Sequence, residues 1–354
     1  MKIFHAFIFT IVFFLISLSG KSQGCSDAGL CSFGSMSILS DRYVNIPLEQ
    51  SKLIPMNVVD STGLDFSMLH DTTARVGVNK NQQIKKDSAS SASLLSCEFT
   101  TYYGIGEQNT SIFITQLEGN FKLIDRKLYG QIKLPYSIIN GNLGSTNGLS
   151  DVSMSLSYFA IKKPKCNLSL AMGVKIPANQ SDLSKNNRPL PMVYQTSLGS
   201  TDILLGSRFT YRKWDFSLGY QHSFNANSNQ YVHLSSINDS ATYNGYFESK
   251  NLRRHDDALF RINRKYEIKK VVLNSGLLFI YHTGNDDITN FLGERIKGVG
   301  SKGLTLNLDF AGSIPLSKHV DFTFVLAKPL VQRKYVDDGL ARSFVGIVGL
   351  KRNF

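Results

Sequence analysis

The chain has 354 residues, with 39 Lys and Arg against 27 Asp and Glu, which gives a formal net charge of +12. It contains no recognisable nucleic-acid-binding motif and no Cys/His spacing typical of zinc, so neither nucleic-acid binding nor a metal site is expected. Beyond residue 23 the longest uninterrupted apolar stretch is about five residues, Leu277 to Tyr281, which excludes a transmembrane helix there. Only a closed β-barrel would let the mature chain cross a membrane.

The amino-terminal segment predicts export. Lys2 precedes the apolar run Ile3 to Ile16, and small residues follow the run. This order is typical of a secretory signal peptide, and the run is shorter than the roughly 20 apolar residues that a membrane helix needs. We place the signal peptide at residues 1–23. A lipoprotein acylated at Cys25 is the weaker alternative, because residues 22–24 lack the aliphatic residue expected before such a cysteine.

Residues 24–92 lack the regular pattern of the rest of the chain and are expected to form a plug in the lumen or a periplasmic extension. A further hairpin through residues 58–59 and 75–78 would raise the strand count from 12 to 14. Cys25 and Cys31 enclose a short loop in an expected oxidising compartment. They are therefore the candidate disulfide, with their pairing left open.

From about residue 93 the chain settles into repeated alternation of apolar and polar residues. Trp214, Phe216 and Leu218, for example, alternate with smaller or polar residues. This period of two is typical of β-strands that are apolar on one side. Most segments are long enough to cross a bilayer as tilted strands of about 9–11 residues, whereas ordinary strands average about five or six. Twelve segments are predicted, at about 93–105, 109–121, 126–137, 150–161, 165–176, 200–212, 214–224, 254–266, 269–282, 302–314, 318–331 and 340–354.

The connections between these segments alternate in length. Five are short and mostly basic. The six that alternate with them are generally longer and polar, at 105–109, 138–149, 177–199, 225–253, 283–301 and 332–339. Outer-membrane barrels have short periplasmic turns and longer external loops, and an even strand number places both termini in the periplasm. The sequence therefore predicts an all-β fold, a transmembrane antiparallel up-and-down β-barrel of about 12 strands, at residues 93–354 in the bacterial outer membrane. A soluble β-sandwich has no reason to alternate its loop lengths in this way.

Charged residues of the predicted strands are expected to face the lumen, because a charge that faces lipid near the midplane costs about 2–4 kcal/mol. A barrel of twelve strands lies between filled eight-stranded barrels and wide porins of sixteen or more strands. The inward charges have two interpretations. They form a polar pathway whose Arg and Lys residues attract anions, or they pair with one another and keep the barrel rigid. The candidates are Lys133, Lys175, Asp202, Arg208, Arg212, Asp215, Arg261 and Asp309.

Catalysis and cofactors are not expected. His222 and Ser223 superficially resemble the pair of a lipid hydrolase, but adjacent strand residues point to opposite faces and cannot easily share a proton. The sequence has one Gly-x-Ser-x-Gly match, at residues 20–24, but it falls at the end of the predicted signal peptide and not between a strand and a helix, where a nucleophile elbow would lie. Acidic pairs at 256–257, 286–287 and 337–338 offer oxygen ligands to divalent cations. Solvated loop charge is the favoured interpretation of these pairs, because none has a full ligand loop.

The chain closes on an alternating strand whose last residue is aromatic. Val348, Leu350 and Phe354 share the mainly apolar face of this strand. Such an ending is typical of the last strand of an outer-membrane barrel, although soluble sandwiches also end on alternating strands. Strand parity places Phe354 at the periplasmic edge, where the barrel-insertion machinery meets the chain. We interpret Phe354 as an assembly signal.

A short motif resembles that of a known family. Gly148-Leu149-Ser150-Asp151-Val152, followed by an alternating strand, resembles the Gly-Leu-Gly-Asp-hydrophobic signature of the meta-pathway phenol-degradation family of outer-membrane barrels. Residues 133–136 and 173–177 resemble the strand ends that flank this motif, and Ser150 stands where the family has its second glycine. That family is loosely similar to the long-chain fatty acid transporter barrels. The resemblance implies a channel for small, often hydrophobic or aromatic, compounds and supplies no catalytic residues.

We therefore expect an outer-membrane channel or transporter for small molecules, with hydrophobic or aromatic compounds as the implied class. Its expected partners are outer-membrane lipid, the barrel-insertion machinery and a small-molecule solute. The alternative is a barrel without transport that serves a structural role or binds a partner through its long loops 177–199 and 225–253.

Overall fold

The computed structural model describes residues 93–124, 127–234, 240–340 and 342–354. The expected signal peptide, the expected plug or extension at 24–92, and the candidate disulfide Cys25–Cys31 lie outside these residues. Within the described part of the chain, no helix is long and apolar enough to cross a membrane.

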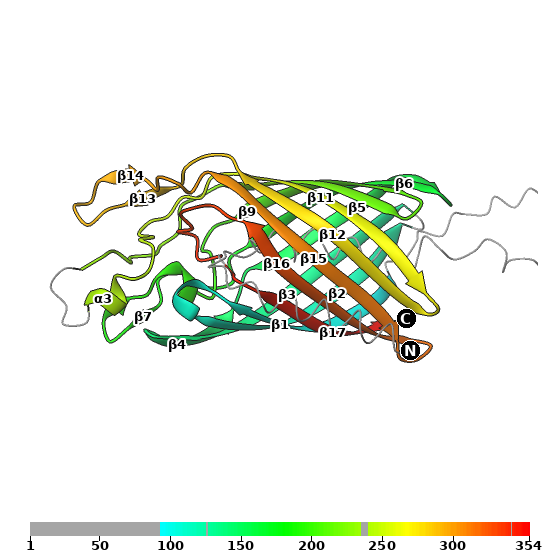
Figure 1. Cartoon of the computed structure of the whole chain (residues 1–354), viewed down its shortest axis with the longest axis horizontal. Coiled ribbons are helices and arrows are strands. Elements are labelled where there is room, and N and C mark those ends of the chain that lie inside the picture. The colour runs from blue at the N-terminus through cyan, green and yellow to red at the C-terminus, as the bar shows by residue number, and fades with distance from the viewer. Residues whose placement is uncertain (1–92, 125–126, 235–239, 341) are drawn as a thin grey trace, which may run out of the picture.

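Twelve antiparallel strand positions form one closed barrel, and all twelve predicted segments are confirmed (Figure 1). The ring closes because β1 pairs with both β2 and β17, while β2 also pairs with β3. Period-two alternation and short basic turns are enough to give this meander of neighbouring strands. The wall strands are β1 (Ser93–Ile105), β2 (Ser111–Ile124), β3 (Leu128–Gly141), β4 (Gly144–Leu149), β5 (Val152–Lys163), β6 (Cys166–Ile176), β9 (Asp202–Tyr211), β10 (Trp214–Ser223), β11 (Asp257–Ile268), β12 (Val271–His282), β15 (Gly303–Pro315), β16 (Val320–Val331) and β17 (Val345–Asn353).

Short helices and short strands lie at one end of the barrel. They lie in the longer connections, on the left in Figure 1, whereas the short turns lie on the right with the carboxyl terminus. The hairpin β13–β14 projects beyond the wall at the left-hand end (Figure 1). These elements are η3 (Glu107–Asn109), β7 (Ser184–Lys185), β8 (Arg188–Pro189), η4 (Met192–Tyr194), α3 (Ser240–Tyr243), β13 (Asp287–Thr289) and β14 (Arg295–Lys297).

One predicted external loop is in fact a hairpin. The segment 138–149 was expected to be a loop, but β3 continues to Gly141, and β4 starts at Gly144 after a two-residue turn. Gly144 has φ +128°, a conformation that favours glycine. β3 pairs first with β4 and then with β5, so these two strands occupy one position in the wall, interrupted at Ser150 and Asp151. The strand count therefore stays at twelve.

The last strand is shorter than the sequence predicts. β17 begins at Val345 rather than near residue 340, because residues 332–340 and 342–344 form no strand and belong to the connection that follows β16. Phe354 follows the strand, and its backbone N–H donates to the carbonyl of Leu95 at 3.0 Å. The end of the chain is thus tied to β1.

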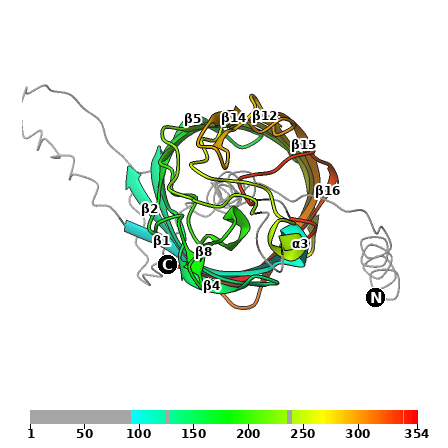
Figure 2. The same ribbon diagram turned by 90° about the vertical axis from the view of Figure 1, so that its left-hand side faces the viewer.

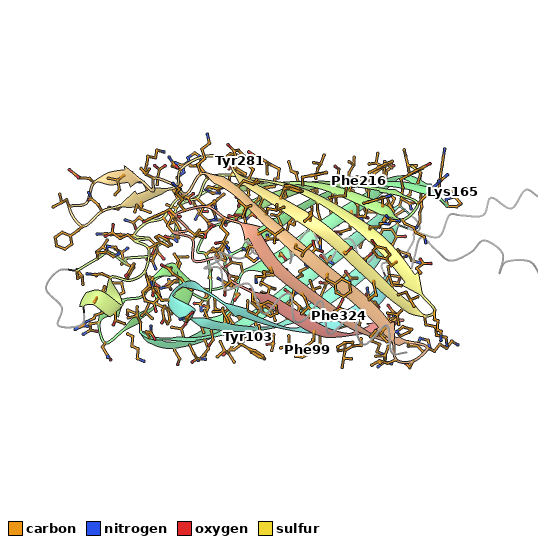
Figure 3. The ribbon with its side chains drawn as sticks, in the orientation of Figure 1. Phe99, Tyr103, Lys165, Phe216, Tyr281 and Phe324 are labelled. Carbon is orange, nitrogen blue, oxygen red and sulfur yellow. The ribbon has the colours of Figure 1, made fainter. Side chains whose placement is uncertain are left out.

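The wall is apolar outside and polar inside. Leu218 on β10 is 57% exposed, whereas its neighbour Ser217 is 8% exposed. Phe99 and Tyr103 lie on the outer wall in Figure 3 and are likewise exposed. Large apolar side chains on the outside of a closed sheet, with charges within it, are what a lipid solvent requires. The fold is therefore that of a transmembrane β-barrel.

Candidate functional site

A row of charged side chains crosses the lumen wall on β17, β1, β2 and β3. The register places Glu98 opposite both Lys351 and Glu118, and Glu118 opposite Lys133. The predicted lumen residue Lys133 is 3% exposed, and its Nζ lies 3.7 Å from the carboxylate of Glu118. Thr323 donates a 2.7 Å hydrogen bond to Glu98. Two adjacent buried acids are therefore flanked by lysines on both sides.

Two further predicted lumen cations pair with predicted lumen acids. Arg208 on β9 forms an ion pair with Asp215 on β10, and both are buried. Arg261 on β11 lies 2.6 Å from Asp309 on β15, across β12. Gly276 of β12 leaves room for the side chain of Asn263 next to this pair, because a Cβ at Gly276 would meet it. These pairs join neighbouring and next-neighbouring strands on the inside of the wall.

Arg212 lies just beyond the end of β9 rather than within the strand, and at the short-turn end it lines a pocket together with the inward residues Arg208 and Asp215. It occupies the turn between β9 and β10 with φ +54°, so the alternation that points strand residues inward has ended before it. Its side chain is exposed, and its guanidinium lies 5.3 Å from the centre of the outward-facing Tyr211 ring.

The connection 177–201 folds into the barrel, and we call it the inward loop. Its element β8 lies within the outline of the wall when the barrel is viewed from the loop end (Figure 2). Leu190, Val193 and Tyr194 are buried in a cluster with Ile112 of β2 and Ile139 of β3. The Tyr194 hydroxyl accepts from the Leu143 backbone N–H at 3.0 Å and hydrogen-bonds the Tyr246 hydroxyl at 3.0 Å, so polar contacts also hold the inward loop in place. We call the inward loop, together with the external connections beside it, the cap.

Asp151 fastens the inward loop to the wall, although the sequence suggested no role for it beyond its place in the family motif. It lies at the interruption between β4 and β5, where its carboxylate turns into the lumen. Ser197 donates to it at 2.5 Å, and the Leu198 backbone N–H donates at 3.2 Å. Lys175, a predicted lumen residue, lies 3.4 Å from the same carboxylate. The strand interruption thus places a charged anchor beneath the cap.

A buried network of charges joins the remaining external connections to the wall, and we call it the ionic latch. Arg254, in the connection 224–256, is its centre: its guanidinium lies 3.0 Å from Asp257, 3.4 Å from Asp338 and 3.4 Å from the predicted lumen residue Asp202. Arg333 adds a second cation at 3.3 Å from Asp338. The latch comprises Asp202, Arg254, Asp257, His282, Asp286, Arg333, Asp337 and Asp338.

His282 bridges two carboxylates of the latch. Its Nδ1 lies 2.7 Å from Asp257 and its Nε2 lies 2.8 Å from Asp286. Because both ring nitrogens face carboxylates, both carry protons and the ring is an imidazolium. Asp286 also accepts from the His255 backbone N–H at 2.6 Å. The end of β12 is thereby tied to the connections on both sides of it.

The pKa values of Asp286 and Asp337 are shifted in opposite directions. Burial and the neighbouring charge of Asp286 raise the pKa of Asp337 well above its ordinary value. Burial acts against the charge of Asp286 too, but the bond and charge of His282 outweigh it, so the pKa of Asp286 is lowered. No N–H or hydroxyl of a described side chain reaches the Asp337 oxygens, which fits a protonated Asp337 that donates to Asp286.

The favoured interpretation of the acidic pairs as solvated charge was therefore wrong for most of these residues. Asp257, Asp286, Asp337 and Asp338 are buried in the latch. In the pair Asp256 and Asp257, only Asp256 faces outward, where it accepts a hydrogen bond from His222 at 2.7 Å. Nothing in the sequence pattern places these pairs together, because they lie on three different connections. Within the described ranges, no three His, Cys, Asp or Glu residues are arranged to hold a metal ion.

The expected separation of His222 and Ser223 is confirmed. His222 bonds Asp256 on the outer side, whereas Ser223 is buried on the lumen side. Beneath the cap lies a cavity of about 60 Å³, lined in part by Tyr102, Asp151 and Met192. A cavity of this size holds a few waters.

Comparisons with known proteins support this fold. No family model matches the chain, and no curated protein matches it. Among solved structures, the COG4313 outer membrane channel from Pseudomonas putida F1 aligns with a TM-score of 0.52 at 13% identity, covering 74% of this chain and 95% of that one. The NanC porin aligns at 8% identity with a TM-score of 0.42, covering 73% and 100% of the two chains. The CymD monoaromatic hydrocarbon channel aligns at 10% identity with a TM-score of 0.37, covering 74% and 88%. The chain is thus similar in fold to an outer-membrane channel, and the expected outer-membrane barrel fold is confirmed.

Proposed function

We propose that the chain is a gated channel for small molecules in the bacterial outer membrane. The observation that carries this proposal is the cap over a polar lumen. The inward loop is fastened to the wall by Asp151, and the ionic latch fastens the connections beside it. A cap held by buried charges whose partners lie on separate elements can act as the closed state of a gate, because each contact is made between elements able to move apart.

The lumen supports a preference for polar solutes of either charge. Four predicted lumen cations each have a carboxylate beside them: Lys133 with Glu118, Lys175 with Asp151, Arg208 with Asp215, and Arg261 with Asp309. Paired charges cancel much of each other's field, so they favour polarity over strict anion selectivity. Hydrophobic or aromatic solutes, the class implied by the family resemblance, gain little from such a wall.

The orientation in the membrane is also part of this proposal. The short turns and Phe354 lie at one end of the barrel, and the cap lies at the other (Figure 1). We place the short-turn end in the periplasm, because periplasmic turns of outer-membrane barrels are short. The cap then faces the outside of the cell.

The test is conductance of the full chain in planar lipid bilayers. In the informative variant, a short Gly-Ser linker replaces residues 182–196, which leaves Asp151, Ser197 and all wall strands in place. We expect brief openings of the wild type and long openings of the variant, with both proteins showing heat-modifiable gel mobility as folded barrels. Two folded proteins that pass neither ions nor small solutes would overturn the channel proposal.

The second candidate, a binding barrel without transport, is favoured by the tip of the β13–β14 hairpin. Phe291 is 66% exposed and Leu292 is 77% exposed at this tip. Paired exposed apolar residues on a projecting hairpin suit contact with another protein. Phe291→Ser together with Leu292→Ser would abolish such binding and leave conductance unchanged, whereas the excision in the inward loop acts on conductance. The two candidates are therefore separable.

A further inference from the structure

Aromatic and cationic side chains gather on the outer wall at the short-turn end of β9, β10 and β11. In the strand register, Tyr211 lies opposite Trp214, and Trp214 lies opposite Arg264. Tyr266 follows on the same face of β11, and Arg212 occupies the adjoining turn. These five residues form one continuous strip, which we call the rim patch.

The arginines of the rim patch lie over aromatic rings. The Arg264 guanidinium carbon is 5.3 Å from the centre of the Trp214 ring and 5.6 Å from that of Tyr266. The Arg212 guanidinium carbon is 5.3 Å from the centre of the Tyr211 ring. These distances are within the range of cation–π attraction. The rings engage the faces of the guanidiniums and leave N–H donors along the edges.

The nearby carboxylates face the other side of the wall. Asp215 is buried in the lumen with Arg208, and Glu267 lies 3.1 Å from Lys265. Among the described residues, neither Arg212 nor Arg264 forms an ion pair with a carboxylate. The positive charge of the rim patch is therefore not neutralised by a carboxylate in the part of the chain that the structure describes.

Further cations border the rim patch. The Arg212 backbone N–H donates to the carbonyl of Lys165 at 2.9 Å, and the Lys265 N–H donates to the carbonyl of Lys213 at 2.8 Å. Lys165 and Lys213 are both exposed, and Figure 3 shows Lys165 at the short-turn end of the wall. The other end of β10 is different, since Tyr220 and His222 there share the carboxylate of Asp256. Positive charge on this outer wall is thus confined to one end of β10.

We propose that the rim patch binds the phosphate of an anionic phospholipid in the membrane leaflet at the short-turn end. The patch lies at the edge of the apolar outer wall, where Phe209 and Phe216 stack with ring centres 6.4 Å apart. At this depth the acyl chains of a lipid meet the apolar wall and its headgroup meets the guanidiniums. Arginine donates in a planar fork that fits two phosphate oxygens at once. Aromatic rings favour the same interfacial depth.

Trp214 supplies the experiment, because it is the only tryptophan in the sequence. The full chain is reconstituted in phosphatidylcholine bilayers that contain a minor fraction of lipid brominated on its acyl chains. The brominated lipid is phosphatidylglycerol in one sample and phosphatidylcholine in the other. Bromine quenches the fluorescence of a tryptophan that it contacts, so binding of anionic lipid appears as stronger quenching by phosphatidylglycerol. We expect enrichment of the anionic lipid to fall about fivefold for each of Arg212→Gln and Arg264→Gln.

Arg352→Gln is the matched control. Arg352 is also an outward arginine at the short-turn end, 5.2 Å from the centre of the Phe354 ring, but it lies on β17, away from β9–β11. It is expected to leave quenching of Trp214 unchanged, while Arg264→Lys retains part of the selectivity. Equal quenching of the wild type by the two lipids would overturn the proposal, and this measurement needs no variant to fold. An effect of Arg352→Gln as large as that of Arg264→Gln would also overturn it, because diffuse surface charge would then explain the binding.

Discussion

Replacing Arg254 with methionine is expected to open the cap. Arg254 is the shared partner of Asp202, Asp257 and Asp338, and all four side chains are at most 3% exposed. Loss of one partner from a buried ion pair typically costs 3–5 kcal/mol, with little relief from solvent. The substitution therefore destabilises the closed cap far more than loss of a surface pair would.

The three carboxylates differ in how well they are compensated once Arg254 is removed. Asp257 keeps His282 and Asp338 keeps Arg333, so each retains a cation. Asp202 keeps the neutral donors Ser200 and Gln221, at 2.8 and 2.5 Å. One carboxylate is thus left with weak compensation, and we take the lower end of the range, about 3 kcal/mol. This shifts the equilibrium between closed and open cap by about a hundredfold.

The assay is the open probability of single channels of the purified full chain at neutral pH. Arg261→Met is the matched control, since it breaks another buried pair, with Asp309 at 2.6 Å, in which both partners belong to wall strands. It should lower the resistance of the barrel to unfolding without raising the open probability. The double variant Arg254→Met with Asp202→Asn should close again in part, because the uncompensated charge is gone.

Two results would refute this reasoning. The first is an open probability of the Arg254→Met channel within about twofold of the wild type, because the expected shift is about a hundredfold. The second is equal opening by Arg261→Met, which would mean that any weakening of the barrel opens the pore.

Three further predictions follow from the cap and the carboxyl terminus. Burial raises the pKa of Glu107, in η3, to about 8 in the closed cap, where Glu107 accepts from the Phe247 N–H at 2.7 Å. The closed cap therefore binds the proton of Glu107 more tightly than the open cap does. It loses stability relative to the open cap as the pH rises from about 4.5 to 8. Conductance should thus increase over this pH range, and Glu107→Gln should flatten the profile; an unaltered profile would contradict the assignment. Gly339→Ala should raise the open probability, because Gly339 has φ +66° and a Cβ there would lie 2.4 Å from the Val193 nitrogen in the inward loop. The backbone strain alone costs about 1–3 kcal/mol. Gly293→Ala is the control for this strain, because Gly293 has φ +84° but open space around it. Deletion of Phe354 should lower the amount of inserted barrel in outer-membrane fractions, while Phe354→Tyr retains it; unchanged membrane levels of the deletion would count against an assembly role.

The twelve wall strands could be predicted because a lipid-facing strand must show its two faces in the sequence. Trp214, Phe216 and Leu218 mark the outer face directly, and the inward Asp215 is their alternate neighbour. The place of Arg212 beyond the end of β9 could not be predicted, because alternation alone does not reveal where a strand ends. The positive φ of Arg212 makes it a turn residue, and this is a property of the backbone rather than of the pattern.

The cap and the latch could not be predicted. The inward loop has no periodic pattern, so its sequence does not indicate that Leu190 and Tyr194 are buried. The acidic pairs are visible, but polar residues are ordinary in external loops, and pairing of Asp338 with Arg254 depends on how two distant connections fold back. Asp151 lay within the family motif, yet its contact with Ser197 exists only once the inward loop has entered the barrel.

The closure between β1 and β17 determines the order in which this barrel can assemble. Every other pair of neighbouring wall strands comes from segments joined by a single connection, whereas the last pairing brings Ser96 to Asn353. Contacts between residues so far apart in the chain carry a large loop-closure entropy and form slowly. Until they form, β1 and β17 both present unpaired backbone edges, to which another chain can add a strand. The β1–β17 pairing is therefore the step of folding at which the chain is most exposed to aggregation. A catalyst that binds β17 until the other strands have paired would protect the chain during this step.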